Sequence, residues 1–150
     1  MKILVVGDAH GNIELMKDLQ NQYPNMDLYL DAGDNLSDSY TLFPFRSCKG
    51  NCDFFNFEDK VLIRTAYGNI FMRHVPYITE QEKKDTIIFI HGHTHKYKIE
   101  KKDNLIILCP GSVALPKDDS HGTYAIINLK EGLISIDIID IFTKKILLHF

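Results

Sequence analysis

Short apolar runs that each end in a polar turn dominate the first third of the chain. The β-branched run Ile3–Val6 predicts a buried strand. Apolar residues then recur every three or four positions between residues 13 and 23, which predicts a helix that Asn12 caps and Pro24 ends. A second apolar strand is expected near residues 27–32. A strand, a helix and a strand in this order favour a parallel pair joined by a right-handed crossover.

Apolar runs separated by turns make the rest of the chain rich in β-strands. Residues 35–45 are expected to form a partly ordered loop or a short helix, and residues 79–84 a short helix. Further strands are predicted at residues 46–49, 61–65, 70–73, 86–90, 96–100, 105–108, 124–129, 133–139 and 144–148. This mixture predicts an α/β fold of two mixed β-sheets with few helices outside them, formed by a single domain over residues 1–150.

Composition and charge narrow the classes of protein that the chain can belong to. Of its 150 residues, 45% are hydrophobic and 25% are charged, which is typical of a globular domain and excludes disordered and fibrous proteins. The formal net charge of -3 and the lack of an aromatic and basic motif give no support for nucleic-acid binding as a primary role. No apolar run approaches the ~20 residues that cross a membrane. Three cysteines, an odd number, argue against a disulfide framework and for a reducing, cytoplasmic location.

Polar side chains that can bind metal ions follow the carboxyl ends of several predicted strands. They are Asp8, His10, Asp34, Asn51, His74, His93 and His95. Ligands of open α/β sheets bind at those strand ends, so we expect these distant segments to converge. Two carboxylates, an amide oxygen and four imidazoles suit borderline divalent metals such as Mn, Fe, Ni or Zn better than Ca or Mg.

Each of these segments also has an ordinary structural interpretation when it is taken alone. Asp8 can cap a helix entry, and the pairs Gly33-Asp34 and Gly50-Asn51 are typical of turns. A lone histidine such as His74 is more often a hydrogen-bonded residue at a strand end. Residues 91–95 differ, because three imidazoles in five positions are hard to explain by packing. The hypothesis of a metal site therefore depends on the segments meeting.

Taken in order, these segments resemble the motif series of the calcineurin-like metallophosphoesterases, and most closely their small, single-domain prokaryotic phosphodiesterase branch. The motifs are Asp8-x-His10, Gly33-Asp34, Gly50-Asn51, His74 and Gly92-His93-x-His95, with residues 50–53 and 110–116 as signatures of that branch. The resemblance implies a four-layer α/β/β/α sandwich of two mixed β-sheets, with short helices and two divalent metal ions at one edge. It also implies that Asp8, His10, Asp34 and His95 hold the first ion, and that Asp34 bridges to a second ion held by Asn51, His74 and His93.

A centre of this kind predicts a phosphoesterase, and first of all a phosphodiesterase that acts on a small phosphodiester. Two divalent ions carry four positive charges, of which two carboxylates offset two, so the site attracts an anionic phosphoryl group. The nucleophile is expected to be a hydroxide that bridges the two ions, with manganese first among the metals and nickel, iron or zinc as alternatives. Arg46 or Arg73 is a candidate for a further phosphate contact, although a surface charge beside His74 is the better interpretation of Arg73.

Three features depart from the family pattern. Cys52 stands where many relatives have a histidine that protonates the leaving group, which predicts substrates whose leaving oxygen needs little protonation, or water as the acid. His74 is followed by Val75-Pro76, where relatives often have glycine. Only eighteen residues separate His74 from His93, so the helix between them must be short. The thinly covered flank that results predicts a homodimer or a larger homo-oligomer.

Two other classes of protein fit parts of the pattern. A non-catalytic, metal-binding scaffold of the same fold, like the retromer member of the superfamily, would act through protein partners instead of a substrate. The retention of all seven ligand positions favours the enzyme. Residues 93–95 partly match the motif of the metallo-β-lactamase-like hydrolases, but Lys96-Tyr97 does not continue that motif, so this class is set aside.

Overall fold

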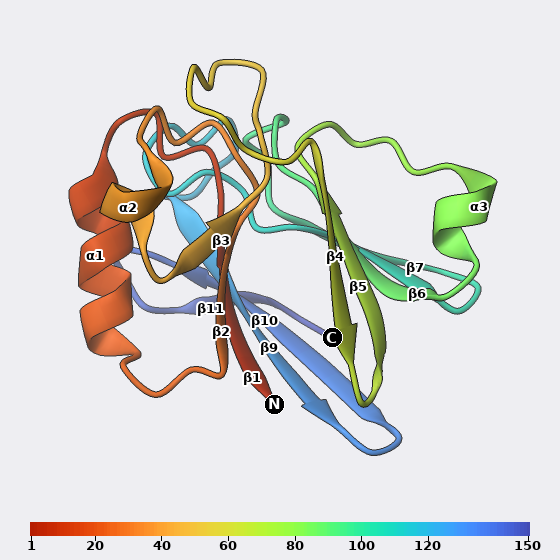
Figure 1. The fold of residues 1–150 in the computed structure, drawn as a ribbon. Coiled ribbons are helices and arrows are strands. Elements are labelled where there is room, and N and C mark those ends of the chain that lie inside the picture. The colour runs from red at the N-terminus through yellow and green to blue at the C-terminus, as the bar shows by residue number, and fades with distance from the viewer.

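Two β-sheets form the centre of the computed structural model, which describes residues 1–150 (Figure 1). The strands of the first sheet are β1 (Lys2–Val6), β2 (Leu28–Asp31), β3 (Phe45–Ser47), β9 (Thr123–Lys130), β10 (Leu133–Asp140) and β11 (Ile146–His149). Those of the second are β4 (Lys60–Thr65), β5 (Gly68–Arg73), β6 (Thr86–Ile90), β7 (Lys98–Lys102) and β8 (Leu105–Cys109). Every strand predicted from the sequence is therefore present, with small shifts at its ends.

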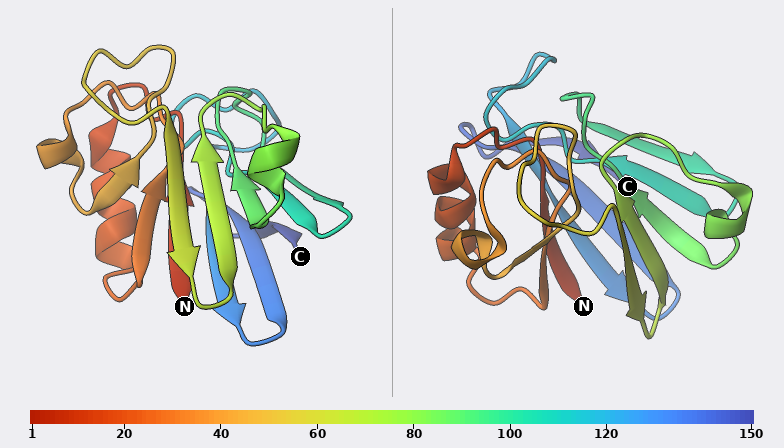
Figure 2. Two further views of the ribbon diagram at one scale, coloured as in Figure 1. Left: turned by 45° about the vertical axis from the view of Figure 1, so that its right-hand side comes forward. Right: turned by 45° about the horizontal axis from the view of Figure 1, so that its top comes forward.

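Both sheets are mixed, as the sequence predicts. The first has the order β11-β10-β9-β1-β2-β3, in which β1, β2 and β3 are parallel and the other pairs are antiparallel. The second has the order β4-β5-β6-β8-β7, in which β5, β6 and β8 are parallel and the two edge strands pair antiparallel with their neighbours. The parallel strands of both sheets end at the same edge of the molecule (Figure 2).

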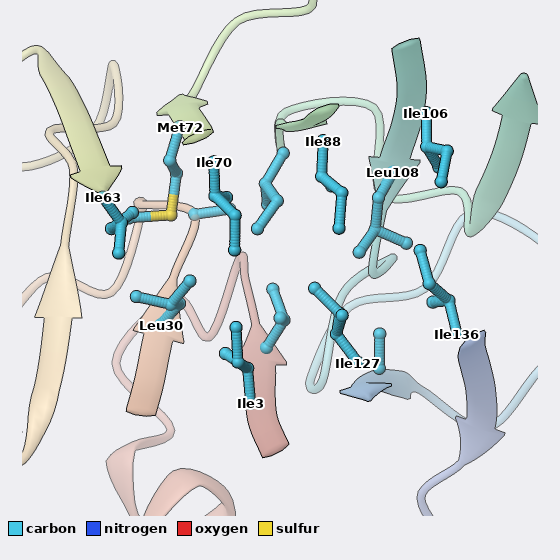
Figure 3. Packing of buried hydrophobic residues seen from close by; sticks show 14 of the residues in the cluster. Ile3, Leu30, Ile63, Ile70, Met72, Ile88, Ile106, Leu108, Ile127 and Ile136 are labelled. Atoms are coloured by element: carbon cyan, nitrogen blue, oxygen red, sulfur yellow. The ribbon is translucent and has the colours of Figure 1, made fainter. Parts of the chain in front are cut away.

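Apolar side chains from the facing sides of the two sheets form the main hydrophobic core (Figure 3). This core contains 18 buried residues. Ile3 and Leu30 from the first sheet face Ile70 and Ile88 from the second. The core holds the two sheets, and hence the loops at their common edge, in one fixed arrangement.

Strand β1 is apolar and buried from Ile3 to Val6 because both of its faces are covered there. Ile3 and Val5 belong to the core between the sheets, whereas Leu4 and Val6 belong to a second cluster on the outer side of the first sheet. Helix α1 (Ile13–Gln22) covers that side and buries Met16 and Leu19 in the same cluster. A strand that is covered on both faces has no need of alternating polar residues.

The outer layer of the first sheet contains two helices that begin in different ways. Asn12 occupies the N-cap position of α1, as predicted, but its side chain makes no capping hydrogen bond. Helix α2 (Ser39–Leu42), in the segment predicted as a loop or short helix, is capped by Asp38, which accepts a hydrogen bond of 2.9 Å from the backbone N–H of Thr41.

The opposite flank is thinly covered, as the short interval between His74 and His93 predicts. Helix α3 (Glu80–Lys83) has only four residues and begins with a capping box formed by Thr79 and Glu82. It lies over the outer face of the second sheet, beside a hollow of about 780 Å³. With α1 and α2 on one side and α3 on the other, the fold is the expected four-layer α/β/β/α sandwich. None of its helices is long and apolar enough to cross a membrane.

Candidate metal centre

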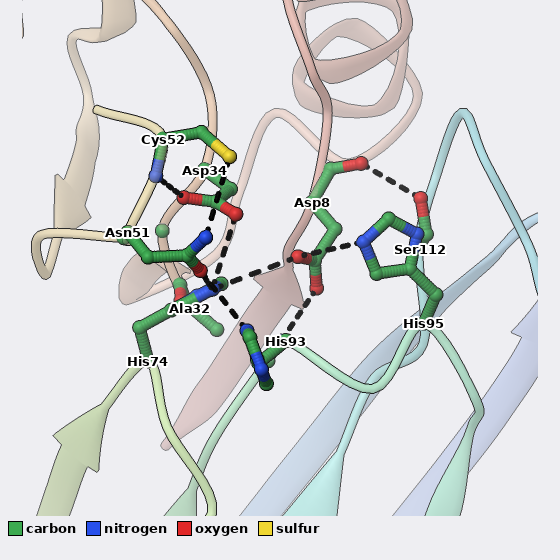
Figure 4. Close-up of polar contacts among 12 residues, drawn as sticks. Asp8, Ala32, Asp34, Asn51, Cys52, His74, His93, His95 and Ser112 are labelled. Carbon is green, nitrogen blue, oxygen red and sulfur yellow. Dashed lines mark hydrogen bonds and ion pairs between the residues drawn. The ribbon is translucent and has the colours of Figure 1, made fainter. Parts of the chain in front are cut away.

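The seven predicted ligand residues lie together at the edge where the parallel strands end, and Figure 4 labels all of them except His10. Each follows a parallel strand: Asp8 and His10 follow β1, Asp34 follows β2, Asn51 follows β3, His74 follows β5, and His93 and His95 follow β6. The expected convergence of distant segments is thus what the structure shows, and His74 takes part in it although Val75-Pro76 follows.

One group of donor atoms gathers around the end of β1. His95 Nε2 lies 3.3 Å from Asp8 Oδ1 and 3.2 Å from His10 Nε2. His10 Nε2 in turn lies 3.9 Å from Asp8 Oδ1 and 3.9 Å from Asp34 Oδ2. These four residues are the ones that the resemblance assigns to a first metal ion.

A second group gathers on the other side of Asp34. His74 Nε2 lies 3.2 Å from Asp34 Oδ2 and 3.0 Å from Asn51 Oδ1. His93 Nδ1 also lies 3.0 Å from Asn51 Oδ1. Asp34 is therefore common to both groups, and its Oδ2 faces the two of them.

The donor atoms present fit divalent metal ions. Asp8 Oδ1 is buried and has no hydrogen-bond partner, which is costly for a carboxylate oxygen unless a cation compensates for it. Three sets of donor atoms each lie within 4.8 Å of one another, namely Asp8–His10–His95, Asp8–Asp34–His74 and His10–Asp34–Cys52. Donors of one small cation, bonded at about 2.1 Å, lie about 3 to 3.5 Å apart. The three separations in the second group have this size, as do those from His95 Nε2 in the first group.

Backbone carbonyls fix which ring nitrogen of two histidines carries the proton. His74 Nδ1 lies 2.7 Å from the carbonyl oxygen of Ala32, and His95 Nδ1 lies 2.7 Å from that of Leu115. Because a carbonyl oxygen only accepts, Nδ1 donates in both cases, and the neutral ring leaves Nε2 free to bind a metal ion. His91, the third histidine of the cluster at residues 91–95, points instead to the flank and bonds through Nδ1 to the carbonyl oxygen of Gly92 at 2.9 Å.

Burial and crowding set the protonation of the centre. Burial raises the pKa of Asp8 to about 8, and the negative charge of Asp34 acts in the same direction, whereas the backbone N–H of His93 and the Lys117 ammonium oppose it. Burial also lowers the pKa of His74 and that of His95, so both imidazoles are neutral near pH 7. A buried carboxyl group that ionises only reluctantly beside a second carboxylate, together with neutral imidazoles, is a site that a bound cation stabilises.

The backbone of the centre adopts a sparsely populated conformation. Eight residues other than glycine have a positive φ, and five of them are predicted ligands: Asp8, His10, Asp34, His93 and His95, with φ between 44° and 70°. Each such residue costs on the order of 1–3 kcal/mol, and strain of this kind concentrates at functional sites. The sequence spacing of these residues does not indicate their positive φ values.

Two glycines allow backbone to approach the two carboxylates. A Cβ atom on Gly50 would lie 2.0 Å from Asp34 Oδ1, and one on Gly92 would lie 2.8 Å from Asp8 Oδ2. Neither glycine has a positive φ, so close approach rather than backbone conformation explains both.

Asp53 is a supporting residue of the centre; the sequence places it in the signature at residues 50–53 but gives it no role of its own. Its buried carboxylate accepts hydrogen bonds of 2.8 Å from the backbone N–H groups of Asp34 and Gly50, 3.0 Å from that of Asn35 and 2.9 Å from that of Leu36. It thereby joins the loop after β2 to the turn after β3. An aspartate at the end of a glycine-rich turn is the only signal for this role in the sequence.

Ser112 is a second supporting residue; it lies in the signature at residues 110–116, but its role was not predicted. Its hydroxyl donates to the carbonyl oxygen of Asp8 at 2.7 Å and accepts hydrogen bonds from the backbone N–H groups of Ala114 and Leu115. The loop after β8 is in this way fixed to the loop after β1. The loop after β8 also supplies the carbonyl oxygen of Leu115, which orients His95.

The structure does not place either candidate arginine at the centre. Arg73 is buried, donates to the carbonyl oxygen of Tyr77 at 2.5 Å and pairs with Glu82 at 2.8 Å, so it fastens α3 to the sheet. Arg46 is half-exposed and lies 3.5 Å from Glu58. Because Glu82 holds the buried Arg73, a phosphate contact by Arg73 is not supported, and the preferred interpretation of Arg73 as a surface charge is wrong. Arg46 pairs with the exposed Glu58, and its contact with a phosphate stays a prediction.

Cys52 lies at the rim of the centre. Its backbone N–H donates to Asp34 Oδ1 at 2.7 Å, and its Sγ accepts a hydrogen bond from Asn51 Nδ2 at 3.4 Å. Partial desolvation and the negative charge of Asp34 raise the pKa of the thiol. Cys48 and Cys109 are buried, and all three cysteines are free, as the odd number predicts.

Known proteins share this architecture. The family model of the calcineurin-like phosphoesterase superfamily domain matches residues 1–132. The probable metallophosphoesterase YsnB of Bacillus subtilis (strain 168) is 28% identical over 156 residues, which cover 93% of this chain and 91% of that protein. A predicted phosphoesterase from Streptococcus pneumoniae TIGR4 superposes with a TM-score of 0.86 at 20% identity, over 99% of this chain and 96% of the other. Vps29 from Entamoeba histolytica, in a complex with zinc, superposes with a TM-score of 0.74 at 19% identity, over 100% of this chain and 98% of that protein.

The two solved structures support the fold alone, because their identity to this chain is low. The family match goes further, since it runs from β1 through β9 and contains all seven predicted ligands. The matched residues include the five loops whose carboxylates, amide and imidazoles face one another in the centre. By this match and by its donor set, the chain belongs to the calcineurin-like phosphoesterase superfamily, a family of metal-dependent phosphoesterases.

Proposed function

We propose that this protein is a phosphodiesterase that works with two divalent metal ions, manganese first among them. The observation that carries the proposal is the sharing of Asp34 by two groups of donors. One carboxylate between two ligand sets is what two neighbouring cations require. The first ion would be held by Asp8, His10, Asp34 and His95, and the second by Asp34, Asn51, His74 and His93. Nickel, iron and zinc suit the same nitrogen and oxygen donors and are the alternatives to manganese.

The charge of the centre favours a phosphoric ester as substrate. When bound, the two ions would bind phosphoryl oxygens and supply a nucleophilic water at neutral pH. Asp8 and Asp34 offset two of their four positive charges, and the neutral imidazoles of His74 and His95 offset none. The two bound ions would therefore keep about two net positive charges, which attract the anionic group of the substrate.

The leaving group that the site can serve is limited by Cys52. A thiol whose pKa is raised gives up its proton too reluctantly to replace an imidazole as general acid near pH 7. Among phosphoric esters, those with an acidic leaving group such as a phenol need little protonation. We therefore propose small phosphodiesters with such leaving groups as the substrates that this chain hydrolyses best.

A metal-reconstituted assay tests the proposal. The protein is freed of metal, loaded with Mn²⁺ and given a panel of aryl phosphodiesters, cyclic nucleotides and phosphomonoesters. The proposal expects turnover of aryl diesters, with losses of at least about 100-fold in kcat for Asn51→Ala and His93→Ala, as for other groups that hold the catalytic centre. His149→Ala is the matched control, because His149 is exposed and pairs only with Asp137. No Mn²⁺-dependent turnover with any ester would refute the proposal.

A scaffold that acts through protein partners is the second candidate, favoured by the likeness to Vps29. Such a protein could bind metal and still hydrolyse nothing. Thermal unfolding and turnover measured with the same Mn²⁺-loaded sample separate the two candidates. A rise in melting temperature without hydrolysis would favour the scaffold, whereas both effects together favour the enzyme.

The location and assembly of the protein also belong to this proposal. Three free cysteines fit a reducing, cytoplasmic compartment. The hollow beside α3 is the surface on which we expect a homodimer or larger homo-oligomer to form. Sedimentation of the wild-type protein measures the assembly state directly.

A further inference from the structure

A phosphate-binding centre can use a cationic side chain besides its metal ligands, and both candidate arginines already pair with an acidic side chain. Arg73 is held by Glu82, and Arg46 lies beside Glu58. The loop that follows β8 supplies a different candidate, Lys117.

The backbone of this loop is hydrogen-bonded to the centre at three points. Ser112 Oγ donates to the carbonyl oxygen of Asp8 at 2.7 Å. His95 Nδ1 donates to the carbonyl oxygen of Leu115 at 2.7 Å, and the backbone N–H of Lys117 donates to the carbonyl oxygen of His95 at 2.9 Å. The position of Lys117 is therefore fixed relative to the first group of donors.

The Lys117 side chain has no partner within the protein. It is exposed and makes no ion pair or side-chain hydrogen bond, whereas its neighbour Asp118 binds the backbone N–H groups of Tyr97 and Ser120. The backbone N–H of Lys117 binds the carbonyl oxygen of His95 at 2.9 Å, so the side chain begins one hydrogen bond away from a donor of the first group. A free ammonium on an anchored backbone beside the donors is placed to meet an incoming anion.

We propose that Lys117 binds a non-bridging phosphoryl oxygen of the substrate, on the side of the centre formed by Asp8 and His95. The ligand class is an anionic phosphoric ester, and this assignment rests on the proposed function. Lys117 contributes attraction and orientation and takes no part in proton transfer. Its contribution is larger for a dianionic monoester than for a monoanionic diester, because the ammonium interacts with one more negative charge.

Two variants and a matched control test this role. Lys117→Gln removes the charge at similar length, Lys117→Arg keeps it, and Lys96→Gln removes an exposed charge from the residue that follows His95 in the sequence. For Mn²⁺-loaded protein, we expect Lys117→Gln to raise both KM for an aryl phosphodiester and Kd for inorganic phosphate about 10-fold, as for loss of one charge-assisted hydrogen bond. We expect kcat to change less, Lys117→Arg to restore most of the binding, and Lys96→Gln to resemble wild type.

Salt and metal titrations distinguish phosphate binding from an indirect effect. Added salt is expected to weaken phosphate binding less steeply in Lys117→Gln than in wild type, because one cationic contact is gone. The rise in melting temperature on adding Mn²⁺ is expected to be the same in both. Equal phosphate Kd values for Lys117→Gln and Lys96→Gln, or a loss of Mn²⁺ affinity instead of phosphate affinity, would overturn the proposal. If Mn²⁺-loaded wild type hydrolyses the ester but Lys117→Gln binds phosphate as tightly as wild type, only the role of Lys117 is refuted. If Mn²⁺-loaded wild type neither hydrolyses the ester nor binds phosphate, the proposed function is refuted as well.

Discussion

The Asp53 carboxylate accepts a hydrogen bond of 2.8 Å from the backbone N–H of Asp34, the residue that the two donor groups share. The same carboxylate accepts three more backbone N–H groups, from Asn35, Leu36 and Gly50. Asp34 has a positive φ of 59° and so needs support from its surroundings. Asp53 supplies that support and holds the turn that carries Asn51.

Replacing Asp53 is expected to damage both stability and metal binding. Asp53→Ala leaves four backbone N–H groups without their acceptor, so we expect the free energy of unfolding to fall by about 2–4 kcal/mol in urea titrations. The rise in melting temperature on adding Mn²⁺ is expected to be mostly lost. Asp59→Ala, an exposed aspartate on the same loop, is the control and is expected to behave as wild type. Equal behaviour of the two variants would contradict the role given to Asp53.

Gly50 tests the close approach between the turn after β3 and Asp34. A Cβ atom there would lie 2.0 Å from Asp34 Oδ1 and 2.3 Å from its backbone nitrogen, so Gly50→Ala must displace the shared carboxylate. We expect a loss of about 3 kcal/mol in stability and at least about 10-fold in Mn²⁺ affinity, measured by calorimetry. Gly132→Ala has open space but a φ of +69°, so it is expected to lose only about 1 kcal/mol and no affinity. Unchanged Mn²⁺ binding by Gly50→Ala would show that the carboxylate does not need this position.

The raised pKa of Asp8 makes the stability of the metal-free protein depend on pH. The unfolded chain releases this proton near its ordinary pKa of 3.8, whereas the folded protein keeps it up to about pH 8. Stability is therefore full below about pH 4 and falls as the pH rises toward 8, by about 3–5 kcal/mol for this group. Asp31, whose pKa burial raises to about 6, adds to the fall in the lower part of that range.

An Asp8→Asn variant separates this effect from other titrations. Without a carboxylate to ionise, metal-free Asp8→Asn is expected to be more stable than wild type at pH 8 and to lose less stability between pH 5 and 8. Its melting temperature is expected to respond much less to Mn²⁺, because a donor of the first group is gone. Urea titrations of both proteins across this range provide the measurement, and parallel curves would show that Asp8 does not carry the dependence.

Cys52 is expected to be dispensable for substrates with acidic leaving groups. Cys52→Ala keeps the backbone N–H that binds Asp34 Oδ1, so the centre should remain in place. We expect kcat for an aryl phosphodiester to stay within about threefold of wild type, a change far smaller than the 10²–10⁴-fold of a general acid. Cys48→Ala, at a buried cysteine, controls for loss of a thiol. Abolished aryl turnover in Cys52→Ala alone would mean that the thiol acts as the acid.

Much of this molecule could be predicted from the sequence because its elements are short and locally encoded. The run Ile3–Val6 is apolar on both faces because a core and a helix cover it. The donors could be found because each directly follows a parallel strand, and such strand ends meet at one edge. Asn12 shows the limit, since a residue of the right type stands at the N-cap without using its side chain.

The supporting residues could not be predicted because they act through contacts between distant loops. Asp53 binds backbone groups 17 to 19 residues away, and Ser112 reaches Asp8 across 104 positions. Backbone N–H and carbonyl groups are present at nearly every position, so no residue type marks such a partner in the sequence. Arg73 was misjudged for the same reason, because its carboxylate partner Glu82 depends on where α3 folds back.

The central claim is that seven side chains surround two cations that share Asp34. Anomalous diffraction from crystals grown with manganese measures this directly. We expect two peaks about 3.5–4 Å apart, one beside Asp8, His10 and His95 and the other beside Asn51, His74 and His93, with Asp34 touching both. A single peak or none, with Asn51 and His74 turned away from the metal, would contradict the account.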